Sequence, residues 1–265
     1  MTTSYKAAPD IDVLATTAEI PGFGSIAINA FVLGGPVPML VDTGAVVDRD
    51  EFMAALRAVI DPADLGYIWL THTDFDHIGA LAQLLTENAG LRVITTFLGV
   101  GILGLAAPLP MDRVRFVNPG ETITVGNRTL TAVKPPVFDN ACTTGFYDDA
   151  SGALFSSDCF GALLPAVPGN AADLAEEELR RGQVFWATID SPWIHNVDRA
   201  AFAAELDRFR RIEPQVVLSS HLPPAPGSML DRMADSLAAA PAAERFVGPD
   251  QGALEQLLAQ SDGPA

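Results

Sequence analysis

The stretch WLTHTDFDHIGA, residues 69–80, decides how this sequence folds and where its chemistry lies. Within six residues it carries two imidazoles and two carboxylates, on His72, Asp74, Asp76 and His77. These side chains can all face one point, and without a cation the carboxylates gathered there would repel one another. The pattern therefore predicts a metal site.

The residues around this stretch place the site at the end of a strand. DLGYIWLTH is a short apolar run typical of a buried strand, and HIGALAQLLTEN has the pattern of a helix that follows it. Strand ends in α/β sheets present side chains from rigid backbone into a crevice, so sites are often built there. The alternative is a polar helix cap in which Asp74 or Asp76 accepts backbone N–H groups. The two histidines make that interpretation the weaker one.

Length and composition indicate one globular domain. The 265 residues are 49% apolar and 18% charged, and no linker divides them, so we expect one domain over residues 1–265. The 16 Lys and Arg against 33 Asp and Glu give a net charge of −17, which opposes nucleic-acid binding. No apolar run is long enough to span a membrane. Without a signal peptide, and with only Cys142 and Cys159, the sequence favours the cytoplasm.

The order of strand-like and helix-like stretches predicts an α/β fold. The first part alternates apolar strands with helices such as EFMAALRAVI, and the last third returns to helices around the strand PQVVLSSH. Residues 114–158 carry short β-branched runs separated by turn residues, which predicts an antiparallel meander. The strands in WLTH, LFSSD and VVLSSH each end in a metal-ligating side chain, so we expect His72, Asp158 and His221 to meet.

The histidine- and aspartate-rich stretch resembles the HxHxDH signature of the metallo-β-lactamase superfamily, with Asp74 in place of the second His. VDTGA, upstream, is similar to the strand-ending Asp motif of that family. The resemblance implies an αβ/βα four-layer sandwich, with two mixed sheets back to back and helices outside. A carboxylate at the second position resembles the flavodiiron and oxygen-binding di-iron branch, which uses HxExDH.

The same resemblance implies a set of metal ligands. LFSSDCFGAL resembles the segment with the bridging Asp, here Asp158, and VVLSSHLPPAP supplies a final His, here His221. Where the branch has an intermediate His, this sequence has Asp139, with Asn140 as a rival. By this correspondence, one metal would be held by His72, Asp74 and Asp139, the second by Asp76, His77 and His221, with Asp158 bridging them. In some members of the branch the residue at the His77 position stands off the metal.

This ligand set favours iron over other metals. Four carboxylates against two divalent cations sum to a neutral site, which lowers the cost of burying the ions. Oxygen-rich sites suit iron or manganese, whereas zinc hydrolases of this fold use more imidazole. We therefore expect two metal ions, iron before manganese or zinc.

Two further residues have weaker interpretations. Asp42 ends the strand in VDTG, and the resemblance makes it a partner that orients a ligand histidine, although an Asp that caps a turn is equally compatible. His195, in SPWIHNVD, has no neighbour at ligand spacing, so we expect it at the surface or at a pocket rim.

Three functions remain open from the sequence. The first, favoured by Asp74 and SDCFG, is di-iron redox chemistry: binding or reduction of dioxygen, nitric oxide or peroxide. The second is hydrolysis of an ester, thioester, lactone or phosphodiester by a metal-bridged hydroxide, the commonest chemistry of this fold. The third is a degenerate site in a binding or sensing protein, suggested by Asp139. In the first two the protein would be an enzyme, an oxidoreductase or a metallo-hydrolase.

The resemblance also implies partners. Flavodiiron enzymes carry a fused flavodoxin domain whose FMN delivers electrons, and these 265 residues contain no such domain. Besides a small-molecule ligand or substrate, we therefore expect a separate flavin-containing electron donor for any reductase activity. Because the branch forms head-to-tail dimers, we also expect a homodimer.

Overall fold

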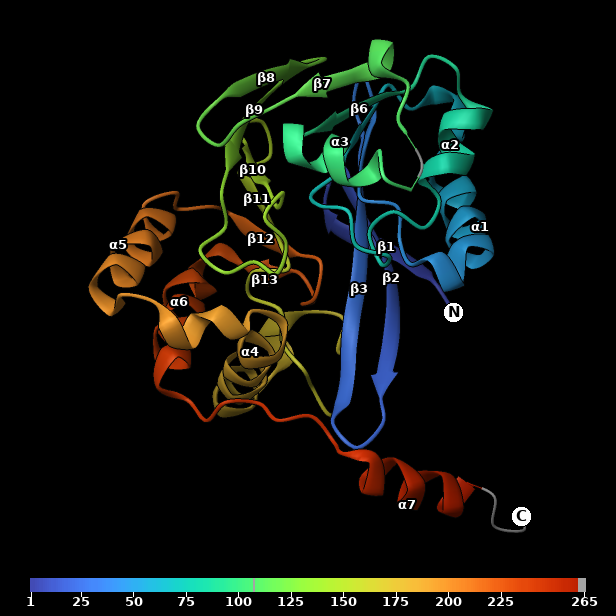
Figure 1. The fold of residues 1–265 in the computed structure, drawn as a ribbon. Helices are drawn as coiled ribbons and strands as arrows, with labels where there is room; N and C mark the ends of the chain where they lie inside the picture. The colour runs from blue at the N-terminus through green and yellow to red at the C-terminus, as the bar shows by residue number, and fades with distance from the viewer. Residues whose placement is uncertain (107, 262–265) are drawn as a thin grey trace.

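The computed structural model describes residues 1–106 and 108–261, and within them two β-sheets pack face to face with helices on both outer sides (Figure 1). This is the expected αβ/βα four-layer arrangement. The expectation of one domain across residues 1–265 includes Ala107 and residues 262–265, which lie outside the described part.

The first sheet has seven strands in the order β1-β2-β3-β4-β5-β6-β7. Strands β1 to β4 are antiparallel and β4 to β7 are parallel. The strands are β1 (Thr3–Ala8), β2 (Ile11–Ile20), β3 (Gly24–Leu33), β4 (Met39–Val41), β5 (Tyr67–Trp69), β6 (Arg92–Thr95) and β7 (Val114–Phe116). The helices on its outer face are α1 (Arg49–Val59), α2 (Leu81–Glu87) and α3 (Phe97–Leu103) (Figure 1).

The second sheet has six strands in the order β13-β12-β11-β10-β9-β8. Only the β11–β12 pair is parallel. The strands are β8 (Thr122–Val125), β9 (Arg128–Val133), β10 (Gly145–Asp148), β11 (Ala153–Ser157), β12 (Val216–Ser219) and β13 (Ala225–Pro226). Its outer face carries α4 (Glu176–Asp190), α5 (Arg199–Arg210) and α6 (Leu230–Ala239), while α7 (Gln251–Ser261) extends away from the sandwich (Figure 1).

Short 3-10 helices occupy several of the connections between these elements. They are η1 (Val46–Asp48), η2 (Pro62–Asp64), η3 (Met111–Arg113), η4 (Ala171–Asp173), η5 (Pro192–Asn196), η6 (Gly227–Met229) and η7 (Ala240–Ala242). In the described part of the chain, no helix is both long and apolar enough to cross a lipid bilayer.

Alternation of side chains along the strands builds the layers. In β3, Phe31 and Leu33 point into the core between the sheets, whereas Ala30 and Val32 point to the core under the outer helices. Successive side chains of a strand face opposite sides of the sheet, so a strand that is apolar throughout can be covered on both faces. This double burial explains why the strands read as continuous apolar runs in the sequence.

The expected meander over residues 114–158 is wrong at its first strand. Strand β7 pairs in parallel with β6 and forms the edge of the first sheet, and the antiparallel run starts only at β8. The segment β6–α3–β7 is a crossover connection, in which the helix returns the chain so that the next strand runs parallel. Short β-branched runs look alike in either sheet, so the sequence pattern does not reveal which neighbour they pair with.

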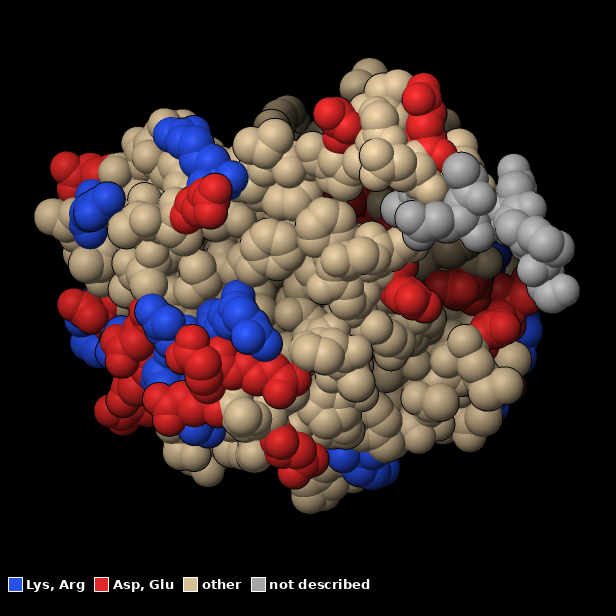
Figure 2. All heavy atoms as spheres, turned by 90° about the horizontal axis from the view of Figure 1, so that it is seen from below, with Lys and Arg blue, Asp and Glu red and all other residues tan. Residues whose placement is uncertain are grey.

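Figure 2 shows how charge is distributed on one face of the molecule. Lys and Arg side chains on that face lie scattered among Asp and Glu and form no large basic patch. Among the described residues, some basic side chains are paired with acidic ones: Arg210 lies 2.7 Å from Asp235, and Arg208 lies 2.8 Å from Glu205. The scatter of basic side chains fits the strongly acidic composition.

Candidate metal centre

Three strand ends bring the expected metal-ligating side chains to one edge of the sandwich. His72 follows β5, Asp158 directly follows β11, and His221 follows β12. Strands β11 and β12 are neighbours in the second sheet, whereas β5 belongs to the first. The site therefore lies between the two sheets, at the ends of their strands.

Asp158 occupies the middle of the cluster. Its Oδ2 lies 3.2 Å from Nε2 of His72, and its Oδ1 lies 3.3 Å from Nε2 of both His77 and His221. One carboxylate thus faces one imidazole with one oxygen and two imidazoles with the other. This is the arrangement that a carboxylate shared between two cations would have.

On the side of His77 and His221, a second carboxylate comes from Asp76. Its Oδ2 lies 3.3 Å from Nε2 of His77 and 3.4 Å from Nε2 of His221. One donor atom of each of these three side chains lies within 4.8 Å of the others, so a single ion can contact all three. The structure thus brings together the residues expected around the second metal.

On the side of His72, donor atoms of His72, Asp74 and Asp139 also lie within 4.8 Å of one another. Nε2 of His72 is 3.8 Å from Oδ1 of Asp139. Asn140 does not belong to this group, since its side-chain amide donates a hydrogen bond to Oδ1 of Asp74 at 2.9 Å. Asp139, and not Asn140, therefore lies in this group, at the position where the flavodiiron branch has a histidine. Asn140 instead hydrogen-bonds to Asp74.

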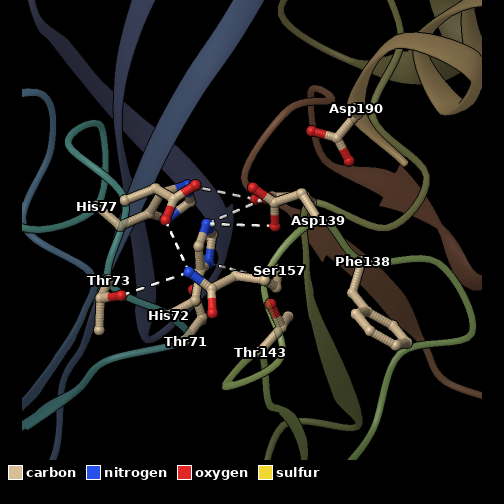
Figure 3. A network of polar contacts seen from close by, with 12 residues as sticks. Thr71, His72, Thr73, His77, Phe138, Asp139, Thr143, Ser157 and Asp190 are labelled. Atoms are coloured by element: carbon tan, nitrogen blue, oxygen red, sulfur yellow. Dashed lines mark hydrogen bonds and ion pairs between the residues drawn. The ribbon is translucent and has the colours of Figure 1, made fainter. Parts of the chain in front are cut away.

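The far side of each imidazole ring contacts a group that orients it. Nδ1 of His77 lies 2.9 Å from Oδ2 of Asp42, and Nδ1 of His221 lies 2.8 Å from the Ala27 carbonyl. Nδ1 of His72 lies between the hydroxyls of Thr71 and Ser157, at 3.1 and 3.2 Å. With Nδ1 thus engaged, each ring turns Nε2 toward Asp158, as metal-ligating histidines turn it toward an ion. Figure 3 shows this for His72 and His77.

Several donor atoms in the cluster have no hydrogen-bond partner. Nε2 of His72, Nε2 of His77 and Oδ1 of Asp158 are buried and have no hydrogen-bond partner, and all three residues are almost inaccessible to solvent. Unpaired polar atoms are costly in an interior, so several of them aimed at one place call for a ligand. Imidazole nitrogens with carboxylate oxygens are a donor set that suits divalent transition metals. The side chains present therefore fit metal ions.

The charged groups in the cluster shift one another's pKa values. Although burial alone would lower the pKa of His221, the Asp158 carboxylate raises it to about 9. Burial alone would raise the pKa of Asp158, but the charges of His72, His221 and His77 hold it well below the usual range. Burial, and then the nearby Asp158, raises the pKa of Asp139 to about 8. The raised pKa values of His221 and Asp139 both reflect nearby carboxylate charge, which a cation would offset.

Tight backbone packing supports the site. Asp42 and Ser157 have φ values of 56° and 52°, a conformation uncommon for residues with a side chain. At Gly79 a Cβ atom would lie 2.4 Å from the Ala45 carbonyl oxygen, so only glycine fits there. The loop after β4 and the loop after His77 therefore lie directly against each other, which places Asp42 beside the His77 ring.

The sequence interpretation left His195 outside the metal-ligand set and did not consider Asp190. His195 is partly buried in η5 and takes part in none of the metal-ligating groups of the described residues. Asp190, which we did not expect, has a carboxylate oxygen within 4.8 Å of oxygens of Asp139 and Asp158. Burial, and then the Asp158 charge, raises the pKa of Asp190 to about 7. One signal was available: Asp190 ends a helix, where an acidic side chain faces the negative end of the helix dipole.

Comparison with known proteins identifies the family and several relatives. A family model described as ODP family beta lactamase matches residues 27–221. Rubredoxin-oxygen oxidoreductase of Megalodesulfovibrio gigas is 26% identical over 168 residues, which cover 62% of this chain and 41% of that protein. Anaerobic nitric oxide reductase flavorubredoxin of Salmonella arizonae is 28% identical over 134 residues, covering 50% and 28% respectively. The chain thus spans less than half the length of either relative.

A solved structure shows the same fold. The rubredoxin oxygen:oxidoreductase of Desulfovibrio gigas superposes with a TM-score of 0.76 at 19% identity, covering 89% of this chain and 61% of that one. The matched region of the family model contains all seven side chains of the expected ligand set, from His72 to His221. The chain belongs to the ODP family of beta lactamases, a metallo-β-lactamase-fold family, and resembles the flavodiiron proteins within that superfamily.

Proposed function

We propose that this protein binds two iron ions and uses them to bind or reduce a small diatomic molecule, dioxygen or nitric oxide. The observation that carries the proposal is the position of Asp158, whose two oxygens face His72 on one side and His77 and His221 on the other. The relatives, a rubredoxin-oxygen oxidoreductase and an anaerobic nitric oxide reductase, support the choice of substrate.

In this proposal each side chain of the cluster has a defined task. His72, Asp74 and Asp139 hold one ion, and Asp76, His77 and His221 hold the other. Asp158 bridges the two, because its oxygens are the only ones that approach imidazoles on both sides among the described ion pairs. Thr71, Asp42 and the Ala27 carbonyl keep the imidazole rings aimed inward.

The balance of oxygen and nitrogen donors supports iron and redox chemistry. The set has four carboxylates and three imidazoles, and carboxylate-rich sites suit iron or manganese. A pair of adjacent iron ions supplies both binding positions and electrons for a diatomic molecule. A zinc hydrolase of this fold would offer a histidine where this chain has Asp74.

Reduction would require an external source of electrons. We propose that a separate flavin-containing protein supplies them, as the resemblance to the flavodiiron proteins implies. A homodimer with one metal domain per chain, spanning residues 1–265, completes the proposal.

Metal analysis tests this function directly. Protein purified without chelator is analysed for iron, manganese and zinc, and the ferrous form is then mixed anaerobically with nitric oxide while its absorbance is followed. We expect about two irons per chain and a spectral change on mixing, both reduced in His72→Ala. Two zinc ions and no response to nitric oxide would indicate hydrolysis, and protein that takes up no metal would indicate a degenerate site.

A further inference from the structure

The last residue of α4 is an aspartate in an unfavourable place. Asp190 lies at the carboxyl end of a 15-residue helix, where the helix dipole repels negative charge, and no basic residue lies in that last turn. Its side chain is partly buried, and among the described contacts it receives one hydrogen bond, from Oγ of Ser191 to Oδ2 at 3.2 Å. A carboxylate in such a position needs a cation or a proton nearby.

The structure holds this helix end against the loop that carries Asp139. In η5, Nε1 of Trp193 donates a hydrogen bond to the Phe138 carbonyl at 2.7 Å, and the two aromatic rings lie 5.0 Å apart. Lys134 also contacts this loop, since its Nζ lies 3.7 Å from the centre of the Phe138 ring. Figure 3 shows the resulting placement of Asp139 and Asp190, on the side of the network away from His77.

At this position Asp190 adds a third carboxylate to those of Asp139 and Asp158. Oxygens of Asp139, Asp158 and Asp190 lie within 4.8 Å of one another, close enough to contact one ion. An independent observation points to that ion: Nε2 of His72 is fully buried and unpartnered, and it lies 3.2 Å from Asp158 and 3.8 Å from Asp139. The unpartnered Oδ1 of Asp158 is also buried.

We propose that Asp190 is a further metal ligand, which binds the ion on the His72 side together with Asp139 and Asp158. This inference rests on the proposed dinuclear site and extends its ligand set by a residue from a different part of the fold. It also gives a reason for the departure at position 139. With an aspartate from the loop and an aspartate from α4, this side of the site is built mainly from oxygen donors.

The added ligand changes the charge of the site. The five carboxylates then carry −5 against +4 from two divalent ions, a sum of −1, and a ferrous–ferric pair at +5 brings the sum to zero. The carboxylates are those of Asp74, Asp76, Asp139, Asp158 and Asp190. An uncompensated negative charge stabilises the higher oxidation state of a nearby iron. The site is therefore expected to prefer hard, oxygen-loving ions and to be easier to oxidise than one without Asp190.

Replacing Asp190 by asparagine distinguishes two roles for this residue, that of a metal ligand and that of a protonated carboxyl beside the site. In Asp190→Asn the side chain keeps its shape and its ability to hydrogen-bond, as a protonated Asp190 would, but it loses the charge that binds a cation. Metal-free protein is titrated with Mn²⁺ and with Fe²⁺ under anaerobic conditions, and the stoichiometry and the affinity of each ion are measured. Asp173→Asn, an exposed residue of η4, is the matched control.

We expect Asp190→Asn to weaken binding of one of the two ions by about tenfold or more and to leave the other unchanged. In the iron-loaded protein the midpoint potential should shift upward. The control should match the wild type, and equal melting temperatures of the metal-free proteins would show that the variant folds. Two ions bound by the wild type and by Asp190→Asn with equal affinity would overturn the role of Asp190 and leave the dinuclear site standing. A wild-type protein that binds no ion would overturn both.

Discussion

The Asp42 carboxylate lies 2.9 Å from Nδ1 of His77 and also accepts hydrogen bonds from the backbone N–H and the hydroxyl of Thr71, at 2.8 and 2.7 Å. Asp42 and His77 are each about 1% exposed to solvent. With Nδ1 as the donor to this carboxylate, the lone pair of Nε2 points at Asp76 and Asp158. The contact therefore fixes both the rotation of the His77 ring and the nitrogen that can bind a metal.

Replacing Asp42 by asparagine should loosen the second metal. The variant Asp42→Asn keeps a residue that tolerates the positive φ of 56° at this position, but it removes the charge that holds His77 Nδ1. We expect metal affinity at the Asp76, His77 and His221 group to fall about 10- to 100-fold. Titration with Co²⁺ or Mn²⁺ measures this. Asp64→Asn, an exposed change of the same chemistry, should have no effect, and equal affinities in all three proteins would show that Asp42 only caps a turn.

Replacing single histidines by alanine should separate those that bind metal, His72 and His221, from His195. We expect His72→Ala and His221→Ala each to lose about one of the two ions, because each removes a coordinate bond and leaves carboxylates under-compensated. His195→Ala should keep both ions, since His195 belongs to none of the metal-ligating groups of the described residues. Elemental analysis of the three variants decides this. If His195→Ala lost as much metal as the other two, the assignment of the histidines would be wrong.

Replacing Asp139 by histidine should change which metal the site prefers. Asp139 lies 3.8 Å from Nε2 of His72 and at the rim of the cluster, so a histidine there can reach the same ion. A neutral imidazole in place of a carboxylate should raise the reduction potential and shift the preference toward zinc. Metal content and near-ultraviolet charge-transfer absorbance of the two proteins measure this. Ala141→Ser, an exposed change in the same loop, is the control for disturbance of the loop. Identical profiles for Asp139→His and the wild type would remove Asp139 from the site.

Bound metal should raise the free energy of unfolding by more at high pH than at low pH. In the metal-free protein the pKa values of Asp139 and Asp190 are raised to about 8 and about 7, and that of His221 to about 9. The folded chain therefore keeps protons that the unfolded chain, with carboxyl pKa values near ~4 and an imidazole pKa near ~6.5, releases earlier. The free energy of unfolding of the metal-free protein should fall as pH rises through this range.

Metal ions replace these protons, so binding strengthens as pH rises. The difference in melting temperature between the metal-loaded and the metal-free protein should widen from about pH 5.5 to about pH 8. Differential scanning calorimetry at several pH values measures it. A constant difference across this range would mean that the metal does not displace protons from these side chains.

Much of the fold can be predicted from the sequence because its signals are local. The helix at EFMAALRAVI appears as α1, with Phe52, Met53 and Leu56 on its buried face. The strands in YIWL, LFSS and VVLS appear as β5, β11 and β12, each bounded by polar or turn residues. The N-terminal strands β1 and β2 were not expected, because mixed runs such as TSYKAA become strands only through pairing with a partner.

The sequence by itself determined most of the side chains that gather at the proposed metal site. His72, Asp74, Asp76 and His77 are gathered by their spacing alone, because a strand end followed by a short loop keeps them within reach of one point. Asp158 and His221 follow in the same way from their positions directly after buried strands. These are properties of short segments, and short segments fix their own geometry once the strands form.

Only the tertiary structure decided how those segments meet. The contact between Asp42 and His77 joins residues 35 apart, and the hydrogen bond from Trp193 that places Asp190 beside Asp139 spans 55 residues. The choice between Asp139 and Asn140, and the entry of Asp190 into the cluster, depend on how α4 packs against the loop before β10. No local pattern encodes such contacts, because they arise from the burial of side chains on separate elements whose relative placement is set by the whole core.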